Sequence, residues 1–139
     1  MQCFDKAISI YPKYAEAWNG KGLAMYRKKS FEALEFYNEA IRLNPNYAEA
    51  YYNKGKFLYY LGNYEEAQKC FEESVTISPR YQEAHYSLAV AKIKNGQIAE
   101  GLQIVKKLIM EDNKYADIAC NDEELDNIRN DERFKEICE

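Results

Sequence analysis

The sequence contains few residues that interrupt helices, with only six glycines and three prolines among 139 residues. The composition argues against a disordered chain, because 47% of the residues are hydrophobic and supply enough apolar surface for a core. The length corresponds to one ordinary domain, which leaves no room for separate catalytic and regulatory domains. We therefore expect a single packed helical domain over residues 1–139.

The sequence also lacks long apolar runs and a dominant positive charge. No stretch approaches the roughly 18 consecutive apolar residues of a membrane span, and residues 1–6 lack the basic-then-apolar layout of a signal peptide. Residues 1–116 hold 16 basic and 14 acidic residues, whereas residues 117–139 hold three basic and nine acidic ones. This distribution does not match the basic stripe of a nucleic-acid-binding protein. These features predict a cytoplasmic protein with neither a membrane nor a nucleic-acid partner.

Motifs that carry chemistry are scarce. The cysteines Cys3, Cys70, Cys120 and Cys138 form no C-x-x-C pair, and the single histidine, His85, has no cysteine near it in sequence. We expect no metal site, and we interpret the cysteines as free thiols that serve as small hydrophobic residues. The sequence has no G-x-S-x-G, no H-E-x-x-H and no phosphate-binding glycine loop. It therefore predicts neither an enzyme nor a cofactor.

What the sequence does contain is an internal repeat. The segment YAEAW at residues 14–18 returns as YAEAY at 47–51 and, weakened, as YQEAH at 81–85, with steps of 33 and then 34 residues. One residue is missing from the first full repeat, and we place this deletion in the turn 27–30, where a change of length is tolerated best. Small residues, large apolar residues and prolines recur at the same steps. The recurring sets are Gly22, Gly55 and Ala89; Ala33, Ala67 and Gly101; Tyr37, Phe71 and Val105; and Pro12, Pro45 and Pro79.

These residues resemble the tetratricopeptide repeat family, whose pattern is W-x2-L-G-x2-Y, then A-x3-F, then P. The positions that match it are Trp18, Gly22, Ala33, Tyr37, Ala40 and Pro45 in one repeat, and Tyr51, Gly55, Ala67, Phe71 and Pro79 in the next. The resemblance implies an all-α fold, a right-handed α-solenoid of antiparallel helix hairpins. Its expected parts are a half repeat at 1–14, whole repeats at 15–47, 48–81 and 82–115, and an acidic helical cap at 116–139.

Local signals place the ends of the helices. The pairs Gly62-Asn63 and Asn95-Gly96 are expected to end the first helix of two hairpins in a left-handed backbone conformation. In the acidic end, Asn121 and Glu124 predict a capping box, followed by an apolar stripe that can cover the last repeat. The stripe consists of Leu125, Ile128, Phe134 and Ile137. The alternative for this end is that it recruits a basic partner or folds into the groove.

The resemblance implies a scaffold or adaptor that binds a peptide segment of a partner protein in a concave groove lined by the first helix of each repeat. Tyrosine suits such contacts, because its amphipathic ring loses little entropy on binding. Of the Lys, Asn and Arg with which chaperone-binding members of the family grip a terminal carboxylate, only Asn53 has a counterpart here. The expected peptide-binding residues are Asn19, Tyr26, Tyr52, Asn53, Lys56, Tyr59, Tyr60, Tyr86 and Val90.

A second hypothesis is a structural or self-association module that is a fragment of a larger repeat protein. The half repeat 1–14 is a second helix without its first, so Phe4, Ala7 and Ile8 lack one neighbour. Another chain could supply the missing contact and form a homo-oligomer.

Overall fold

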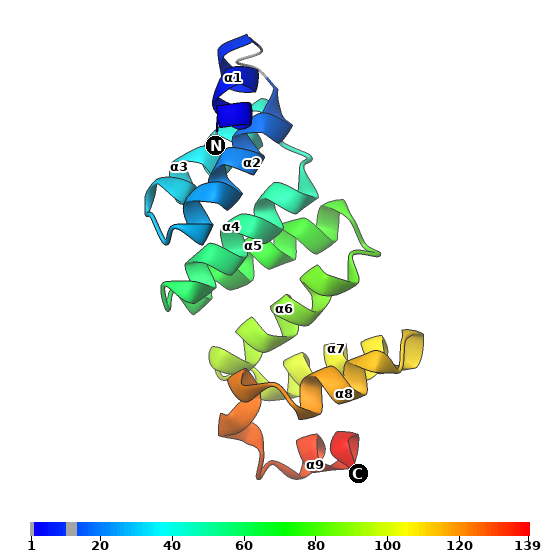
Figure 1. The fold of residues 1–139 in the computed structure, drawn as a ribbon. Coiled ribbons are helices and arrows are strands. Elements are labelled where there is room, and N and C mark those ends of the chain that lie inside the picture. The colour runs from blue at the N-terminus through cyan, green and yellow to red at the C-terminus, as the bar shows by residue number, and fades with distance from the viewer. Residues whose placement is uncertain (1, 11–13) are drawn as a thin grey trace. The chain divides into compact units, whose positions relative to one another are not determined.

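The computed structural model describes residues 2–10 and 14–139, and every regular element within them is a helix (Figure 1). This confirms the all-α fold of antiparallel hairpins. The chain forms two compact units, residues 1–80 and residues 81–139. The elements are α1 (Gln2–Ile10), α2 (Ala15–Arg27), α3 (Glu32–Leu43), α4 (Ala48–Tyr60), α5 (Tyr64–Ile77), α6 (Gln82–Lys94), α7 (Ile98–Glu111), α8 (Lys114–Cys120), the 3-10 helix η1 (Glu123–Ile128) and α9 (Glu132–Cys138).

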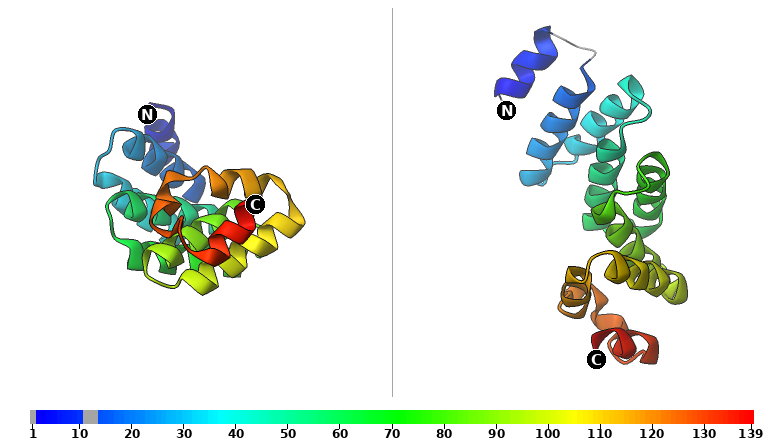
Figure 2. Two further views of the ribbon diagram at one scale, coloured as in Figure 1. Left: turned by 90° about the horizontal axis from the view of Figure 1, so that it is seen from below. Right: turned by 90° about the vertical axis from the view of Figure 1, so that its right-hand side faces the viewer.

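The first unit consists of α1 packed on α2, followed by the hairpins α2–α3 and α4–α5 (Figure 2). In each hairpin, a glycine on the first helix faces an aromatic ring on the second helix. A Cβ added to Gly22 would lie 2.6 Å from the ring of Tyr37, and one added to Gly55 would lie 2.7 Å from the ring of Phe71. Glycine therefore lets the two helices approach until the ring fills the space between them, as the recurring small residues predict.

The turn between α2 and α3 shows how the first repeat accommodates its missing residue. Lys29 has a φ of 55° and occupies the position that Gly62 and Gly96 take in the later turns, with φ of 84° and 87°. The main-chain N–H of Ala33 donates to the oxygen of Ser30 three residues earlier, at 3.1 Å. The corresponding bond in the next repeat spans four residues, from Ala67 to Asn63. Lys29 and Ser30 still align with Gly62 and Asn63, so the missing residue lies after Ser30, in the first turn of α3, and the prediction of a deletion within the turn 27–30 is wrong. A tighter first turn of α3 absorbs the loss.

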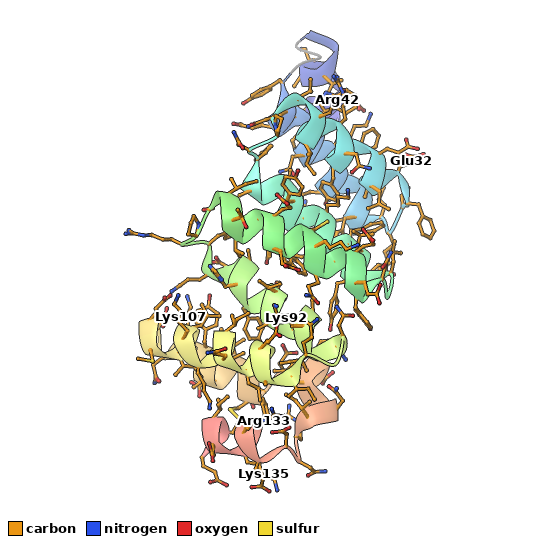
Figure 3. The ribbon with its side chains drawn as sticks, turned by 180° about the vertical axis from the view of Figure 1, so that it is seen from behind. Glu32, Arg42, Lys92, Lys107, Arg133 and Lys135 are labelled. Carbon is orange, nitrogen blue, oxygen red and sulfur yellow. A yellow bond between two sulfur atoms is a disulfide. The ribbon has the colours of Figure 1, made fainter. Side chains whose placement is uncertain are left out.

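The second unit begins with the hairpin α6–α7. Lys92 of α6, labelled in Figure 3, stands where the repeat usually has an apolar residue. Its ammonium pairs with the carboxylate of Glu100 at 2.9 Å. After α7, the short helix α8 follows as α4 follows α3. It starts with the letters YAD at residues 115–117, 34 residues after Tyr81, and Tyr115 is buried. This truncated first helix of a further repeat was not predicted from the sequence.

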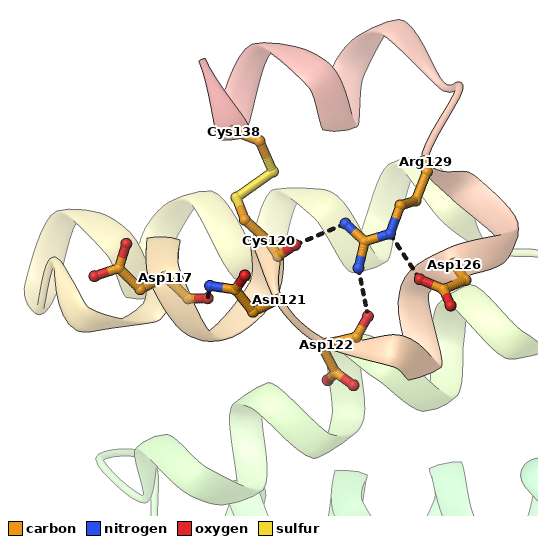
Figure 4. Close-up of a disulfide and its surroundings, with 7 residues drawn as sticks. All are labelled: Asp117, Cys120, Asn121, Asp122, Asp126, Arg129 and Cys138. Atoms are coloured by element: carbon orange, nitrogen blue, oxygen red, sulfur yellow. Dashed lines mark hydrogen bonds and ion pairs between the residues drawn. A yellow bond between two sulfur atoms is a disulfide. The ribbon is translucent and has the colours of Figure 1, made fainter.

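A disulfide between Cys120 and Cys138 joins α8 to α9, with 5.7 Å between the two Cα atoms (Figure 4). The prediction of four free thiols is therefore wrong for these two residues, whereas Cys3 and Cys70 are free. The pair carries no local motif. It forms because η1 and the following turn bring α9 back onto α8, a long-range consequence of the fold.

The acidic end is held by buried apolar residues and by one arginine. Leu125, Ile128 and Phe134 are buried, as the apolar stripe predicts, while Ile137 is half-buried. The guanidinium of Arg129 donates to the main-chain oxygens of Cys120, at 2.7 Å, and of Asp122, at 3.0 Å. These contacts make α8, η1 and α9 one compact structure at the end of the second unit.

The capping box of this segment is not formed by the residues expected. Asp122 is the cap of η1, and its carboxylate accepts a hydrogen bond from the main-chain N–H of Glu124 at 2.9 Å. Asn121 instead donates its side-chain amide to the main-chain oxygen of Asp117 at 2.8 Å, which ends α8. The prediction was wrong by one residue because both side chains can cap a helix and the sequence does not show where α8 ends.

Across the described ranges, no helix combines the length and the apolar character that crossing a membrane requires.

Candidate peptide-binding surface

Three of the predicted residues form a continuous strip along α4. Tyr52, Lys56 and Tyr60 are spaced four residues apart, which places them on one helix face. The ammonium of Lys56 lies 5.3 Å from the centroid of the Tyr52 ring, and Tyr60 is 47% exposed. We call these three residues the α4 strip.

Helix α2 extends the α4 strip at the Tyr60 end. The Tyr26 ring packs edge-on against Phe57 at 5.2 Å and lies 6.1 Å from the Tyr60 ring. The ammonium of Lys29 lies 4.6 Å from the centroid of Tyr60 on the other side of the turn. Burial raises the pKa of Tyr26, so its hydroxyl stays protonated and can donate a hydrogen bond at neutral pH.

Two of the expected peptide-binding residues are buried and bond to each other. The side-chain amide of Asn53 donates to Oδ1 of Asn19 at 3.1 Å, and the amide of Asn19 donates to the hydroxyl of Tyr47 at 3.3 Å. Asn19 and Asn53 are only 4% and 6% exposed. Their amides therefore connect α2 to α4 beneath the surface, and the surface available to a ligand does not include them.

Tyr59 lies apart from the α4 strip. Its ring contacts Tyr64, the first residue of α5, with 4.8 Å between centroids. Tyr59 lies one position before Tyr60, so its side chain points about a quarter turn around α4 from the α4 strip. Its contact with Tyr64 therefore joins the two helices of one hairpin.

The two predicted residues of the second unit, Tyr86 and Val90, are covered by the acidic end. The Tyr86 hydroxyl donates to the carboxylate of Asp122 at 2.6 Å, and its ring lies 5.8 Å from that of Tyr115. Burial, and then the bond to Asp122, raise the pKa of Tyr86. Val90 is buried, and Lys94, one turn further, pairs with Glu124 at 3.4 Å. In the structure, the acidic end is thus folded onto α6, the first helix of its repeat.

The charges around the α4 strip are mostly positive and exposed. Arg27 and Lys56 are exposed, and neither makes an ion pair with any other residue that the structure describes. The nearest carboxylate along α4 is that of Glu49, one turn before Tyr52. Glu65 and Glu72 lie exposed on α5, the second helix of the hairpin, as the repeat predicts. Lys29 was not among the predicted residues, and the exposed basic run at 27–29 was the signal for it.

Within residues 2–10 and 14–139, no group of three or more His, Cys, Asp and Glu side chains could hold a metal ion. The α4 strip and its neighbours on α2 offer aromatic faces, hydroxyl donors and ammonium groups, which suit contact with a polypeptide.

Comparison with solved structures gives the same architecture. The structure described as "Crystal structure of MamA" aligns with a TM-score of 0.73 and 26% identity, covering 84% of this chain and 68% of that one. A second MamA structure gives a TM-score of 0.71 and 26% identity, and there the match covers 64% of its chain, just under two thirds. The Arabidopsis OM64 TPR domain, at 22% identity and a TM-score of 0.68, covers 73% of this chain and 84% of its own and supports the fold alone.

Sequence comparison points to the same family. No curated protein sequence matches the chain significantly. A model described as "Tetratricopeptide repeat" matches residues 48–81, and another described as "TPR repeat" matches residues 32–59. These matches fall on α3, α4 and α5, the helices that carry the glycine–aromatic pairing and the α4 strip. With the repeat, the hairpins and the structural neighbours in agreement, this chain belongs to the tetratricopeptide repeat family.

Proposed function

We propose that this protein is a scaffold that binds a peptide segment of a partner protein along the first helices of its repeats, centred on the α4 strip. The observation that carries the proposal is the row formed by half-buried Tyr52 and exposed Lys56 and Tyr60, on a helix whose other side is packed. Helix α4 buries Ala50, Phe57 and Leu58, so the row stands on a rigid support. A rigid row of tyrosines can bind a peptide without first being ordered, which keeps the entropic cost of binding low.

The family supports a role in protein interaction, since tetratricopeptide repeats generally bind protein partners. We propose in addition that the chain has no catalytic activity of its own and works in the cytoplasm. Blocking thiols with an alkylating agent at the moment of cell lysis tests the location. The Cys120–Cys138 disulfide forms readily in oxidising compartments, so a fully alkylated pair supports the cytoplasm and an intact disulfide contradicts it.

The binding proposal is tested by replacing Tyr52 and Lys56 together with alanine. We expect the affinity for a purified partner, identified by pull-down from the source cell, to fall by more than about 1 kcal/mol, or about fivefold. The matched control replaces Glu65 and Glu72 on α5 with alanine, which should leave the affinity unchanged. Circular dichroism shows whether both variants are folded. Binding that survives the first change and is lost with the second would place the site on the second helices instead.

A second candidate function is self-association through α1. Phe4 packs on Gly20 of α2 and remains 36% exposed, and Cys3 beside it is exposed as well. Light scattering after size exclusion tests this role. A mass that rises with concentration and returns to the monomer with Phe4→Ser supports it, and a monomer at all concentrations contradicts it.

A further inference from the structure

The first helix of the second unit already carries a bound segment, which shows what chemistry this helix face accepts. Tyr86, Val90 and Lys94 follow Tyr52, Lys56 and Tyr60 by 34 residues each, so they hold the positions of the α4 strip in the next repeat. The segment on them is Asp122–Ile128 of the acidic end. Its carboxylates meet the Tyr86 hydroxyl at 2.6 Å and the Lys94 ammonium at 3.4 Å.

The same segment also contains two buried apolar residues. Leu125 is 0% exposed and Ile128 is 3% exposed, and they are three residues apart in η1. The spacing puts both side chains on one side of the short helix. The occupant of α6 therefore combines acidic residues, which bond to a tyrosine hydroxyl and an ammonium, with two apolar residues.

The α4 strip presents similar donors with more positive charge. Tyr52 supplies the hydroxyl at the position of Tyr86, and Lys56 supplies an ammonium where α6 has Val90. Lys29 adds a second ammonium over the Tyr60 ring, at 4.6 Å. The exposed ring of Tyr60 and the half-buried ring of Tyr52 offer apolar surface beside these charges. Charged donors strengthen hydrogen bonds to carboxylates, so an acidic ligand gains more on α4 than on α6.

We propose that the α4 strip recognises an acidic segment within a partner chain, in which at least two Asp or Glu residues precede apolar residues three positions apart. This inference rests on the proposed function and specifies its ligand. The proposed ligand has the same chemistry as the segment Asp122–Ile128, which lies on α6. Recognition uses side-chain carboxylates, so the segment need not lie at a chain end.

The probe is a synthetic peptide with the sequence NDEELDNIR, taken from residues 121–129 and blocked at both termini. Its control is NNQQLNNIR, which keeps the apolar residues and removes the carboxylates. Titration of the full isotope-labelled chain, followed by NMR, gives affinity and location together. We expect the acidic peptide to bind at least about fivefold more tightly than the control and to shift amide signals in α4. Its affinity should fall as salt increases from about 50 to 300 mM.

Variants distinguish binding of the peptide at the α4 strip from binding at α6, where the peptide could displace the protein's own segment. Lys56→Gln should weaken binding of the acidic peptide at least about fivefold, whereas Lys94→Gln and the exposed control Glu72→Gln should not. Binding that is lost with Lys94→Gln but kept with Lys56→Gln would place the ligand on α6 and overturn the proposal. Equal binding of the acidic and neutral peptides, or no binding of either, would overturn it too.

The outcome is independent of the wider function. If the peptide fails but a purified partner still depends on Tyr52 and Lys56, the scaffold function holds and the acidic ligand class is wrong. If the partner is also indifferent to these residues, both proposals fail.

Discussion

The side chains of Asn19 and Asn53 form a buried hydrogen bond 3.1 Å long that joins α2 to α4. Replacing Asn53 with alanine leaves the Asn19 oxygen without this donor. We expect the free energy of unfolding to fall by about 1 to 3 kcal/mol, the usual effect of an unsatisfied buried polar group. Urea denaturation measures the change. Asn38, exposed on α3, is the control, and Asn38→Ala should change the stability by less than about 0.5 kcal/mol. Equal effects of the two changes would contradict a structural role for the pair.

The hydroxyl of Tyr37 is buried and bonds to no described residue. Phe71 holds the corresponding position in the next repeat, so the ring alone is sufficient there. Tyr37→Phe should therefore leave stability unchanged or raise it by up to about 1 kcal/mol. Tyr47→Phe should lower it, because the Tyr47 hydroxyl accepts a hydrogen bond from Asn19. Thermal denaturation of both variants compares them directly, and a clear loss with Tyr37→Phe would show that its hydroxyl has a partner.

Lys29 holds a left-handed backbone conformation at a position where the later repeats have glycine. The variants Lys29→Ala and Lys29→Gly both remove the ammonium from the Tyr60 ring, so their difference reports the backbone alone. The glycine variant should be more stable than the alanine variant by about 1 kcal/mol. Chemical denaturation checks the difference, and an alanine variant that is the more stable of the two would rule out strain in this turn.

Asp131 caps α9 and pairs with Arg133 at 2.7 Å. The hydrogen bonds from Arg133 lower the pKa of Asp131 from 3.8 to about 2. A lowered pKa means that the contribution to stability is complete above the unfolded-state value near 4 and is lost as the pH falls toward 2. NMR titration of the carboxyl carbon should show this pKa in the wild type, and a value closer to 3.8 in Arg133→Ala. If the pKa of Asp131 in Arg133→Ala equals that of the wild type, the main-chain N–H groups lower it and Arg133 does not.

The Cys120–Cys138 disulfide closes a loop across a sequence separation of 18. Cys138→Ser should lower stability by roughly 3 kcal/mol through the greater freedom of the unfolded chain. Reduction of the wild type should give the same loss, and Cys3→Ser, which changes an exposed free thiol, should give none. Denaturation with and without a thiol reductant makes the comparison. A wild type that is indifferent to the reductant would contradict a stabilising disulfide.

The sequence predicted what the repeat determines locally. The turns at Gly62 and Gly96 and the close contacts at Gly22 and Gly55 follow from spacing within one hairpin, and the structure confirms them. The deletion lies just after the predicted turn, because the backbone absorbs it in the first turn of α3. Trp18, at the first position of the family pattern, is only partly buried and stacks on Phe36 at 5.9 Å.

The features that were missed depend on contacts between distant segments. Asn19 and Asn53 are polar residues on the first helices of two repeats, and the hydrogen bonds between them and to Tyr47 allow their burial. The short helix α8 keeps the letters YAD but ends at Cys120, since Asn121 and Asp122 stop it before a full helix forms. No local pattern distinguishes such an early end from the start of a complete repeat.

The arginine at the centre of the closed loop gives the acidic end an unusual response to proteases. A cut at any peptide bond between Cys120 and Cys138 leaves both pieces joined through sulfur, and Arg129 offers trypsin a cleavage site inside that loop. Such a cut adds one water to the mass of the intact chain and removes no residue. The fragment beyond such a cut would separate only after reduction, so a cut inside the loop removes residues from the chain only when thiol exchange also opens the disulfide.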